Sequence, residues 1–509
     1  MSGTQKYVFA LTRNRFEKKC VLSQLVCNNR ILYTYIIMKR IALLLCAVVY
    51  AVTVCRADAI EDFINQPLLR QANIYVLVKE SGSGKILAEH DSEKLAVPAS
   101  ITKLITTATA LELLGGDFKF ETYIETDGQT DSNGTLHGNL YIRGTGDPTL
   151  GSHRLGNMNF INTWIQQIRK YGITRIEGKV IADMSFFDAE AVNSGWIWED
   201  IGNYYAPGIC AISYMDNTLN FQLIGGAVGT QPILTKTIPY IPGLVVENHL
   251  RTSTTLYDEA YVHGVPFSNT RYLTGNIPAN SGLFGLKGDI PNPGLLLAQH
   301  LTDRLRDAGI FVRDSADYTL KQGGERQRIF VHQSPELRNI IAEINFKSNN
   351  HYAEQLFRYL GSLAQVPSST NSSIAVIESY WRNRIAYQTE FIQRDGSGLS
   401  PMNGIPAKVF VNLLDYMLNK SVHAEDFKNS LPVAGESGTL MSFLNGTSLH
   451  GKVHAKSGTT SRVKSYSGYI DANGKRYLFC VIVNNGGGKS KTKQHLIERF
   501  LLHVCSENK

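Results

Sequence analysis

Two residues in the first quarter of the chain have the types and spacing of a nucleophile and its base. Ser100 and Lys103 are three positions apart, and residues with this separation on a helix lie on the same face. A serine hydroxyl becomes an effective nucleophile when a neighbouring base removes its proton. The amine of Lys103 can be that base only if its pKa falls by roughly 3 units from the usual value of about 10.4. Burial or a second nearby cation lowers the pKa of a lysine in this way.

The pattern Ser-x-x-Lys is weak evidence by itself, because it starts at four positions: Ser100, Ser461, Ser490 and Ser506. What distinguishes Ser100 is the helix that it opens. Pro98 favours a helix start, which places Ser100 in the first turn, where the helix dipole favours negative charge. Apolar residues then recur with helical spacing and predict one buried face; they are Ile101, Leu104, Ile105, Ala108, Leu111 and Leu114.

Two further groups of polar residues stand at places where secondary structure is expected to change. Ser348 and Asn350 lie between helical patterns at 336–346 and 353–360. Lys456, Ser457, Gly458 and Thr459 belong to or follow a predicted strand over 453–458. Taken alone, Ser348 and Asn350 are typical of a helix N-cap, and Lys456 is typical of a solvated charge at a sheet edge.

The N-terminal 59 residues predict export. They contain nine Lys or Arg and two acidic residues, and the whole chain carries a net charge of +7, so residues 60–509 are neutral overall. The sequence pI of 8.8 is therefore no evidence for a nucleic-acid partner. A basic start at 38–40, a short apolar run over 41–54 and the small-residue site Ala57-Asp58-Ala59 indicate a secretory signal peptide cleaved before Ile60. Residues 1–37 then form an upstream extension; an uncleaved membrane anchor is the alternative.

The remaining sequence suggests three segments: residues 60–115, a β-rich insertion over 116–289, and residues 290–509. The segment after residue 59 retains Cys210, Cys480 and Cys505, which in an oxidising compartment allows one disulfide and one free thiol. No spacing of Cys, His or acidic residues indicates a metal, and no cofactor is expected.

The three polar groups together, Ser100-x-x-Lys103, Ser348-x-Asn350 and Lys456-Ser457-Gly458, match a set that is found in β-lactamases and penicillin-binding proteins. The third group has serine in place of the usual threonine. With 244 residues between Lys103 and Ser348, Gly-Asp-Pro-Thr-Leu at 146–150 and Asp-Gly-Ser-Gly-Leu-Ser at 395–400, the chain resembles the class C low-molecular-mass penicillin-binding proteins. These are D-alanyl-D-alanine carboxypeptidases and endopeptidases of the cell wall.

The resemblance implies an α/β (α+β) transpeptidase-like domain with inserted β-rich domains, and it assigns a role to each motif residue. Ser100 would be the nucleophile and Lys103 its base, Ser348 would pass a proton to the leaving amine, and Asn350 would bind Lys103 and a substrate amide. Lys456 would be the second cation. Substrate contacts would come from Ser457, Gly458, Thr459 and Asp183, the last meeting the amine of the peptide's third residue unless it lies in a surface turn. The backbone N–H groups of Ser100 and Thr459 would form the oxyanion hole.

The expected partners are peptidoglycan peptides and β-lactam antibiotics, in the periplasm or cell envelope, with peripheral membrane association left open. Two other functions share these motifs. A serine β-lactamase would need a fast deacylating base, which the sequence does not identify. An inert wall-binding or scaffold protein would have no reason to keep all five motif residues. The loop at 395–400 is expected near the site, either as a structural turn or in contact with substrate.

Overall fold

The computed structural model describes residues 59–385 and 390–507, so the expected signal peptide lies outside the described part apart from Ala59. Contacts divide the chain into two units, residues 1–62 and 63–509. The described chain begins with a short helix, α2 (Ala59–Ile64), and a single 3-10 turn at Pro67–Leu69. The sheets, helices and site described below belong to the second unit.

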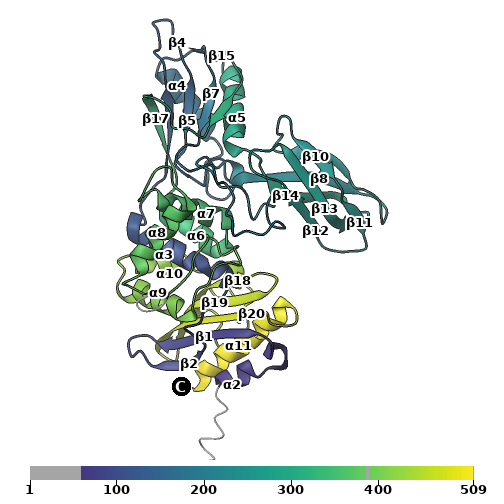
Figure 1. Cartoon of the computed structure of the whole chain (residues 1–509), viewed down its shortest axis with the longest axis vertical. Helices are drawn as coiled ribbons and strands as arrows, with labels where there is room; N and C mark the ends of the chain where they lie inside the picture. Colours follow the sequence, from purple (N-terminus) through teal and green to yellow (C-terminus); the bar gives the residue numbers. More distant parts are fainter. Residues whose placement is uncertain (1–58, 386–389, 508–509) are drawn as a thin grey trace, which may run out of the picture. The chain divides into compact units, whose positions relative to one another are not determined.

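A five-stranded antiparallel sheet joins the two ends of this unit. Its strand order is β18-β19-β20-β1-β2, so early and late segments of the chain lie side by side (Figure 1). Residues 477–484 of the central strand β20 are all buried, which means that both faces of the sheet are covered. Helix α9 packs on β1, β19 and β20, and α11 packs on β19. The bounds are β1 Asn73–Glu80, β2 Ile86–His90, β18 Val453–Thr459, β19 Val463–Ala472, β20 Lys475–Asn484, α9 Ala407–Asn419 and α11 Ser490–Glu507.

The expected helix after Ser100 is present, but it is buried on every side. A 3-10 turn over Ala99–Thr102 leads into α3 (Lys103–Leu114), and residues 103–111 are all buried. The sequence predicted one apolar face, because threonines stand at several of the other positions. The hydroxyls of Thr107 and Thr109 are buried and donate hydrogen bonds to the carbonyls of Lys103 and Ile105. The surrounding helices are α6 Leu337–Lys347, α7 Asn350–Gly361, α8 Thr370–Trp381, α9 and α10 Ala424–Asn429.

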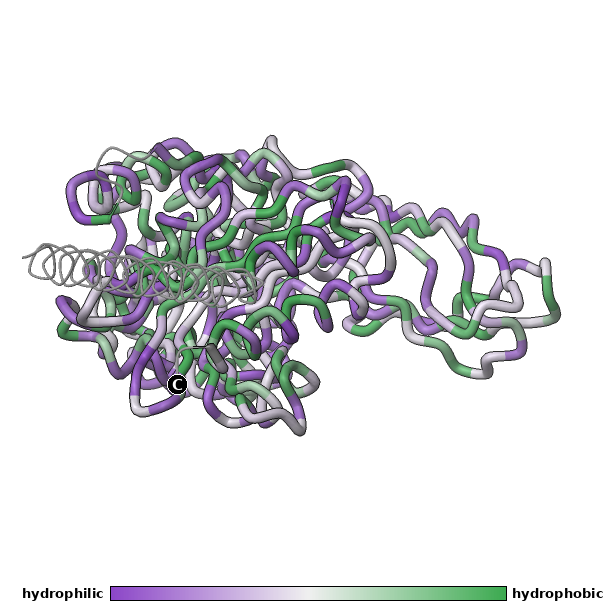
Figure 2. The backbone as a smooth tube through the Cα atoms, turned by 90° about the horizontal axis from the view of Figure 1, so that it is seen from below, coloured by the Kyte–Doolittle hydropathy of each residue, from purple (hydrophilic) through white to green (hydrophobic). Residues whose placement is uncertain are grey.

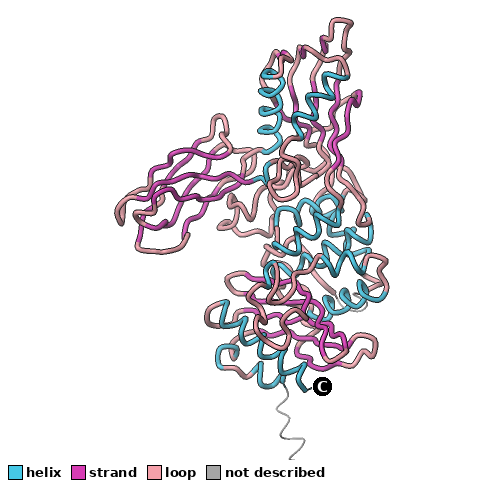
Figure 3. Tube along the Cα trace, turned by 180° about the vertical axis from the view of Figure 1, so that it is seen from behind, coloured by secondary structure: helices cyan, strands magenta, loops and turns pink. Residues whose placement is uncertain are grey.

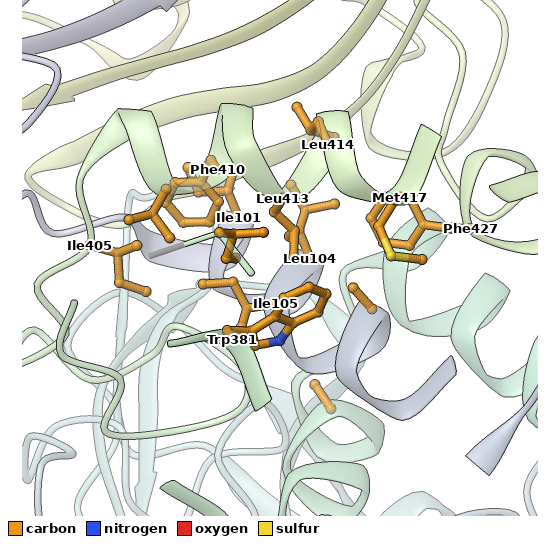
Figure 4. Close-up of a cluster of buried hydrophobic side chains, with 14 of the residues drawn as sticks. Ile101, Leu104, Ile105, Trp381, Ile405, Phe410, Leu413, Leu414, Met417 and Phe427 are labelled. Atoms are coloured by element: carbon orange, nitrogen blue, oxygen red, sulfur yellow. The ribbon is translucent and has the colours of Figure 1, made fainter. Parts of the chain in front are cut away.

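The core of this part packs between α3 and α9. Ile101, Leu104 and Ile105 lie between Trp381 on one side and residues of α9 on the other (Figure 4). The indole of Trp381 is fully buried, and its N–H donates to Thr109 Oγ1 at 2.7 Å. This packing fixes the axis of α3, and therefore the position of the residues at its start.

A second hydrophobic core holds the segment between about residues 124 and 312. Four further sheets belong to this part, ordered β16-β7-β5-β3-β17, β15-β6-β4, β14-β8-β9 and β10-β13-β11 with β12 on β13; Figure 3 shows their strands in magenta. Helix α5 packs on β7 and belongs to this core, although the sequence analysis grouped it with residues 290–509. Along β8, buried and partly exposed residues alternate, and the colours of Figure 2 change correspondingly along the strands of this region.

The elements of the second core have the following bounds: β3 Glu121–Thr126, β4 Thr135–Leu136, β5 Leu140–Arg143, α4 Phe160–Lys170, β6 Arg175–Ile176, β7 Val180–Asp183, β8 Thr218–Gly225, β9 Ile233–Ile238, β10 Val245–Asn248, β11 Arg251–Ser253, β12 Glu259–His263, β13 Thr270–Pro278, β14 Gly282–Asp289, α5 Pro293–Asp307, β15 Phe311–Val312, β16 Asp317–Thr319 and β17 Gln327–Gln333.

Two findings bear on the expectations about the compartment. Cys210, Cys480 and Cys505 are all buried free thiols, so the disulfide that the sequence allowed does not form. In the part of the chain from residue 59 onward that the structure describes, no helix is both long and apolar enough to cross a bilayer.

We expect Trp381→Ala to lower the free energy of unfolding by about 3–5 kcal/mol, because it leaves a large cavity beneath α3 and removes a buried hydrogen bond. Urea unfolding followed by circular dichroism measures this. Leu363→Ala, at a half-exposed position, is the control and should change the free energy by less than about 0.5 kcal/mol. Equal effects of the two substitutions would show that α3 is not held in this way.

Candidate active site

The first two motifs and the end of the third line one cavity of about 750 Å³. Ser100 comes from the 3-10 turn that leads into α3, Ser348 and Asn350 from the junction of α6 and α7, and Thr459 from the end of β18, the edge strand of the five-stranded sheet. Other parts of the wall come from the five-stranded sheet, through Asn73, Tyr75 and Asn484, and from the second core, through residues 197–205 and Tyr261. Segments more than 350 residues apart in the sequence therefore meet at this cavity.

Two glycines hold the backbone on either side of Ser100. A side chain at Gly458 would place its Cβ 3.0 Å from the Ser100 nitrogen and 2.8 Å from the Pro98 oxygen. Gly398, whose φ is +81°, lies so close that its Cβ would be 2.0 Å from the Ala99 oxygen. Ala99 itself has φ +52°, a conformation that L-residues rarely adopt, and the two close contacts keep it there. The backbone N–H of Ser100 is thereby held next to β18.

The amine of Lys103 is fully buried and has three hydrogen-bond partners. Its Nζ lies 3.0 Å from Ser100 Oγ, 2.7 Å from Asn350 Oδ1 and 2.6 Å from the Ser397 carbonyl oxygen. Two of these partners can only accept a hydrogen bond. A neutral amine has two N–H groups and one lone pair, so donation to Asn350 and Ser397 leaves the lone pair for the Ser100 hydroxyl proton. This is the arrangement that a general base needs.

Burial lowers the pKa of Lys103 to about 7, against the opposing effect of the negative charges of Asp395 and Glu354. The size of this fall agrees with the requirement that was set from the sequence. Burial, followed by the charges of Lys103 and Lys464, also holds the pKa of Lys456 well below its usual value.

The orientation of Asn350 is fixed from the second core. Its Nδ2 donates to the Tyr205 carbonyl oxygen at 2.9 Å, so its Oδ1 must face Lys103. The N-cap of α7 is Asn349, whose side chain accepts from the N–H of Tyr352, so the simple capping interpretation of Ser348 and Asn350 is wrong. Since the side chain of Asn349 caps the N-terminus of α7, the side chain of Asn350 is not needed as a cap and can face the cavity.

Ser348 is hydrogen bonded to the third motif. It has a left-handed conformation with φ +57° between α6 and α7, and its Oγ accepts from Lys456 Nζ at 2.9 Å. Lys456 also donates to the Ser457 carbonyl oxygen at 2.8 Å. Neither partner is a carboxylate, so Lys456 is not the solvated edge charge that its strand position alone would suggest.

The other expected substrate-binding residues divide between two places. Thr459 lines the cavity, and its Oγ1 accepts from Lys464 Nζ at 3.0 Å, whereas the Ser457 hydroxyl donates to Thr439. Asp183 does not line the cavity of Ser100. It lies buried at the end of β7, in a separate hollow of about 390 Å³, and is paired with Arg326. Because Arg326 is far away in the sequence, this pairing could not be predicted. The surface turn considered for Asp183 is wrong, because the residue is buried.

Two carboxyl groups that the sequence analysis did not assign to the site support the loop at 395–400. Asp395 accepts hydrogen bonds from Gly398 N, Ser400 N, the Trp196 indole and Asn403. Glu354, one turn after Asn350 on α7, accepts from Ser397 N at 2.7 Å. Burial, followed by the nearby charge of Asp395, raises the pKa of Glu354 to about 8. These hydrogen bonds hold the loop so that the Ser397 carbonyl points at Lys103. Leu399 and Pro401 also line the cavity.

The fold and this cavity define an enzyme of the β-lactamase and transpeptidase type. The model of the D-Ala-D-Ala carboxypeptidase 3 (S13) family matches residues 56–504. The chain is 28% identical over 446 residues to a D-alanyl-D-alanine carboxypeptidase of an Actinomadura species, covering 84% of this chain and 80% of that protein. It is 25% identical over 454 residues to the D-alanyl-D-alanine carboxypeptidase DacB of Haemophilus influenzae, covering 87% and 92%. The crystal structure of penicillin binding protein 4 from Haemophilus influenzae has the same fold, with a TM-score of 0.76 and 24% identity over 88% of this chain and 98% of that one.

The chain belongs to the D-Ala-D-Ala carboxypeptidase 3 (S13) family. It is a serine-type peptidase, as the resemblance found in the sequence implied. Among the residues that the structure describes, no group of three or more His, Cys, Asp or Glu side chains is placed to hold a metal ion.

The site predicts how the acylation rate depends on pH. Lys103 can accept the proton of Ser100 only when it is neutral, and the neutral fraction increases as the pH rises through about 7. The second-order rate of acylation by a chromogenic β-lactam should therefore be about half-maximal near pH 7 and should level off above it. Stopped-flow measurements between pH 5 and 9, an interval of about two units on either side, test this.

Lys103→Arg is the control for this measurement. The guanidinium stays charged throughout the interval, so the rate should fall by at least about a hundredfold and lose its rise near pH 7. A wild-type rate that is independent of pH between 5 and 9 would contradict the role given to Lys103.

Proposed function

We propose that this chain removes the terminal D-alanine from peptidoglycan stem peptides through an acyl-enzyme on Ser100. The observation that carries the proposal is the contact of Lys103 Nζ with Ser100 Oγ at 3.0 Å, while its other two partners leave the lone pair of the amine for the hydroxyl. The activity of the family and the names of the relatives support D-Ala-D-Ala as the substrate.

Acylation begins when Lys103 accepts the hydroxyl proton and Ser100 Oγ attacks the carbonyl carbon of the penultimate D-alanine. The resulting oxyanion binds the backbone N–H groups of Ser100 and Thr459, a type of contact whose loss costs about 3–4 kcal/mol. Ser348, hydrogen bonded to Lys456, delivers a proton to the leaving amine, and the proton that Lys103 took from Ser100 replaces it, so that Ser348 and Lys103 return to their starting states. The C–N bond breaks, D-alanine departs, and water then hydrolyses the ester.

The substrate backbone extends the five-stranded sheet. β18 is an edge strand, and residues 432–434 pair with the outer side of its first half, so the backbone groups from Ser457 onward are the ones that an extended peptide can pair with. The hydroxyl of Thr459 and the amine of Lys464, which donates to it, favour the terminal carboxylate at this end of the strand. The same attack on a D,D-cross-link would make the enzyme an endopeptidase, and attack on a β-lactam ring would leave a stable acyl-enzyme.

The expected location follows from the leader sequence. A signal peptide ending at Ala59 would release residues 60–509 outside the cytoplasm, into the periplasm or the cell envelope, where peptidoglycan lies. Peripheral attachment to the membrane remains an alternative to a free protein in that compartment.

The proposal is tested by measuring D-alanine release from a stem pentapeptide and cleavage of purified cross-linked muropeptides. We expect the wild type to release D-alanine and Ser100→Ala to lose at least about a thousandfold in kcat. Ser490→Ala is the matched control, since Ser490 also begins a Ser-x-x-Lys pattern but does not line the cavity. Release of D-alanine by Ser100→Ala at the wild-type rate would refute the mechanism.

A further inference from the structure

A row of aromatic side chains leads away from the Ser100 cavity along β12 and β13. Tyr261 lines the cavity, and His263 lies two residues further along the same strand. Tyr272 of β13 is the direct cross-strand neighbour of His263. We call this set, with Trp198 and His249, the aromatic row.

The rings of the aromatic row are close and nearly parallel. The centroid of His263 lies 6.2 Å from that of Tyr261, with planes 21° apart, and 5.6 Å from that of Trp198, with planes 7° apart. Further out, His249 and Tyr272 stack at 4.5 Å and 26°. Because opposed residues of an antiparallel pair point to the same face of the sheet, His263 and Tyr272 join the two stacks.

The aromatic row is on the outward side of its sheet. Val262, Arg271 and Leu273, which alternate with it along the two strands, are fully buried. By contrast, 62% of Trp198, 39% of Tyr272 and 36% of Tyr261 remain exposed. One face of Trp198 is covered by His263, so its exposure leaves the other face open. These rings are not part of the buried core, and exposed aromatic clusters of this kind mark binding surfaces.

The chemistry of the row favours a neutral ligand with flat apolar faces and polar edges. His263 Nε2 is engaged by Thr274 Oγ1 at 3.1 Å. Carboxylates surround the cavity end of the row, where Glu199, Asp200 and Asp258 lie near Tyr261, and Glu247 lies beside His249 at the outer end. They disfavour an anionic ligand. The C–H faces of pyranose rings pack on aromatic side chains, while their hydroxyl and acetamido groups bind to such polar groups.

We propose that the aromatic row binds the amino-sugar chain that carries the stem peptide. This inference rests on the proposed function, because continuity with the Ser100 cavity identifies the saccharide as part of the same substrate. Four extended peptide residues between the scissile bond and the sugar span at most about 14 Å. The row starts at the wall of the cavity that Ser100 also lines, and it proceeds in steps of 4.5–6.2 Å. The row would favour glycan-linked peptides over free peptides.

Tryptophan fluorescence tests the binding directly. The chain has four tryptophans, and Trp164, Trp196 and Trp381 are at most 7% exposed, so Trp198 should dominate any change caused by a surface ligand. The probe is neutral, peptide-free glycan strands, namely oligomers of N-acetylglucosamine. We expect a saturable shift of emission to shorter wavelength that is lost in Trp198→Phe and weakened about tenfold in Tyr272→Ala. Tyr240→Ala, an exposed tyrosine outside the row, is the matched control and should bind as the wild type does.

The kinetic test compares kcat/KM for a free pentapeptide and for the same peptide attached to its disaccharide. In Tyr272→Ala, which does not line the cavity, kcat/KM for the attached peptide should fall about tenfold, while that for the free peptide stays unchanged. Equal losses on both substrates, or no loss on either, would overturn the proposal. Unchanged fluorescence on addition of glycan strands would also overturn the proposal, whether the row binds nothing or binds a protein instead.

The two proposals fail in different ways. If the wild type released no D-alanine from either peptide, the proposed function would fall, whereas the fluorescence titration with peptide-free strands would still decide whether the aromatic row binds saccharide.

Discussion

The amine of Lys103 is buried between Ser100, Asn350 and Ser397, and the site depends on this amine being neutral. A charged ammonium would need three acceptors and would have no lone pair for the serine proton. Burial removes the water that would stabilise the charge and so lowers the pKa of Lys103 to about 7. The same burial, followed by the charge of Asp395, raises the pKa of the nearby Glu354 carboxyl.

The rest of the architecture places donors and acceptors around this amine. The five-stranded sheet brings β18 to Ser100, and Gly458 allows the strand to come within contact distance of the Ser100 backbone. The loop at 395–400 reaches the other side, where Asp395 and Glu354 hold its N–H groups so that the Ser397 carbonyl points inward. The second core contributes the Tyr205 carbonyl, which orients Asn350. The inserted strands are therefore connected to the catalytic centre by a specific hydrogen bond.

The sequence predicted the parts of this site that follow from local spacing or from motif identity. The three-residue separation on a helix indicated that Ser100 and Lys103 meet, and the resemblance indicated Ser348, Asn350 and Lys456. The Ser397 carbonyl, Glu354 and Tyr205 could not be predicted in the same way, because a backbone carbonyl has no side-chain signature and each contact joins distant segments. The position of Glu354 one turn after Asn350 was the only sequence signal for it. The pairing of Asp183 with Arg326 could not be predicted for the same reason, since Arg326 is 143 residues away.

The most direct test of the central claim, that Ser100 is a nucleophile activated by Lys103, is intact-mass analysis of residues 60–509 after brief exposure to benzylpenicillin. We expect one adduct per chain, located on the peptide that contains Ser100, persisting for many minutes and absent from Ser100→Ala. Rapid turnover of the drug without a lasting adduct would indicate a β-lactamase. An adduct of equal yield on Ser100→Ala, or no adduct on the wild type, would show that Ser100 is not the activated nucleophile.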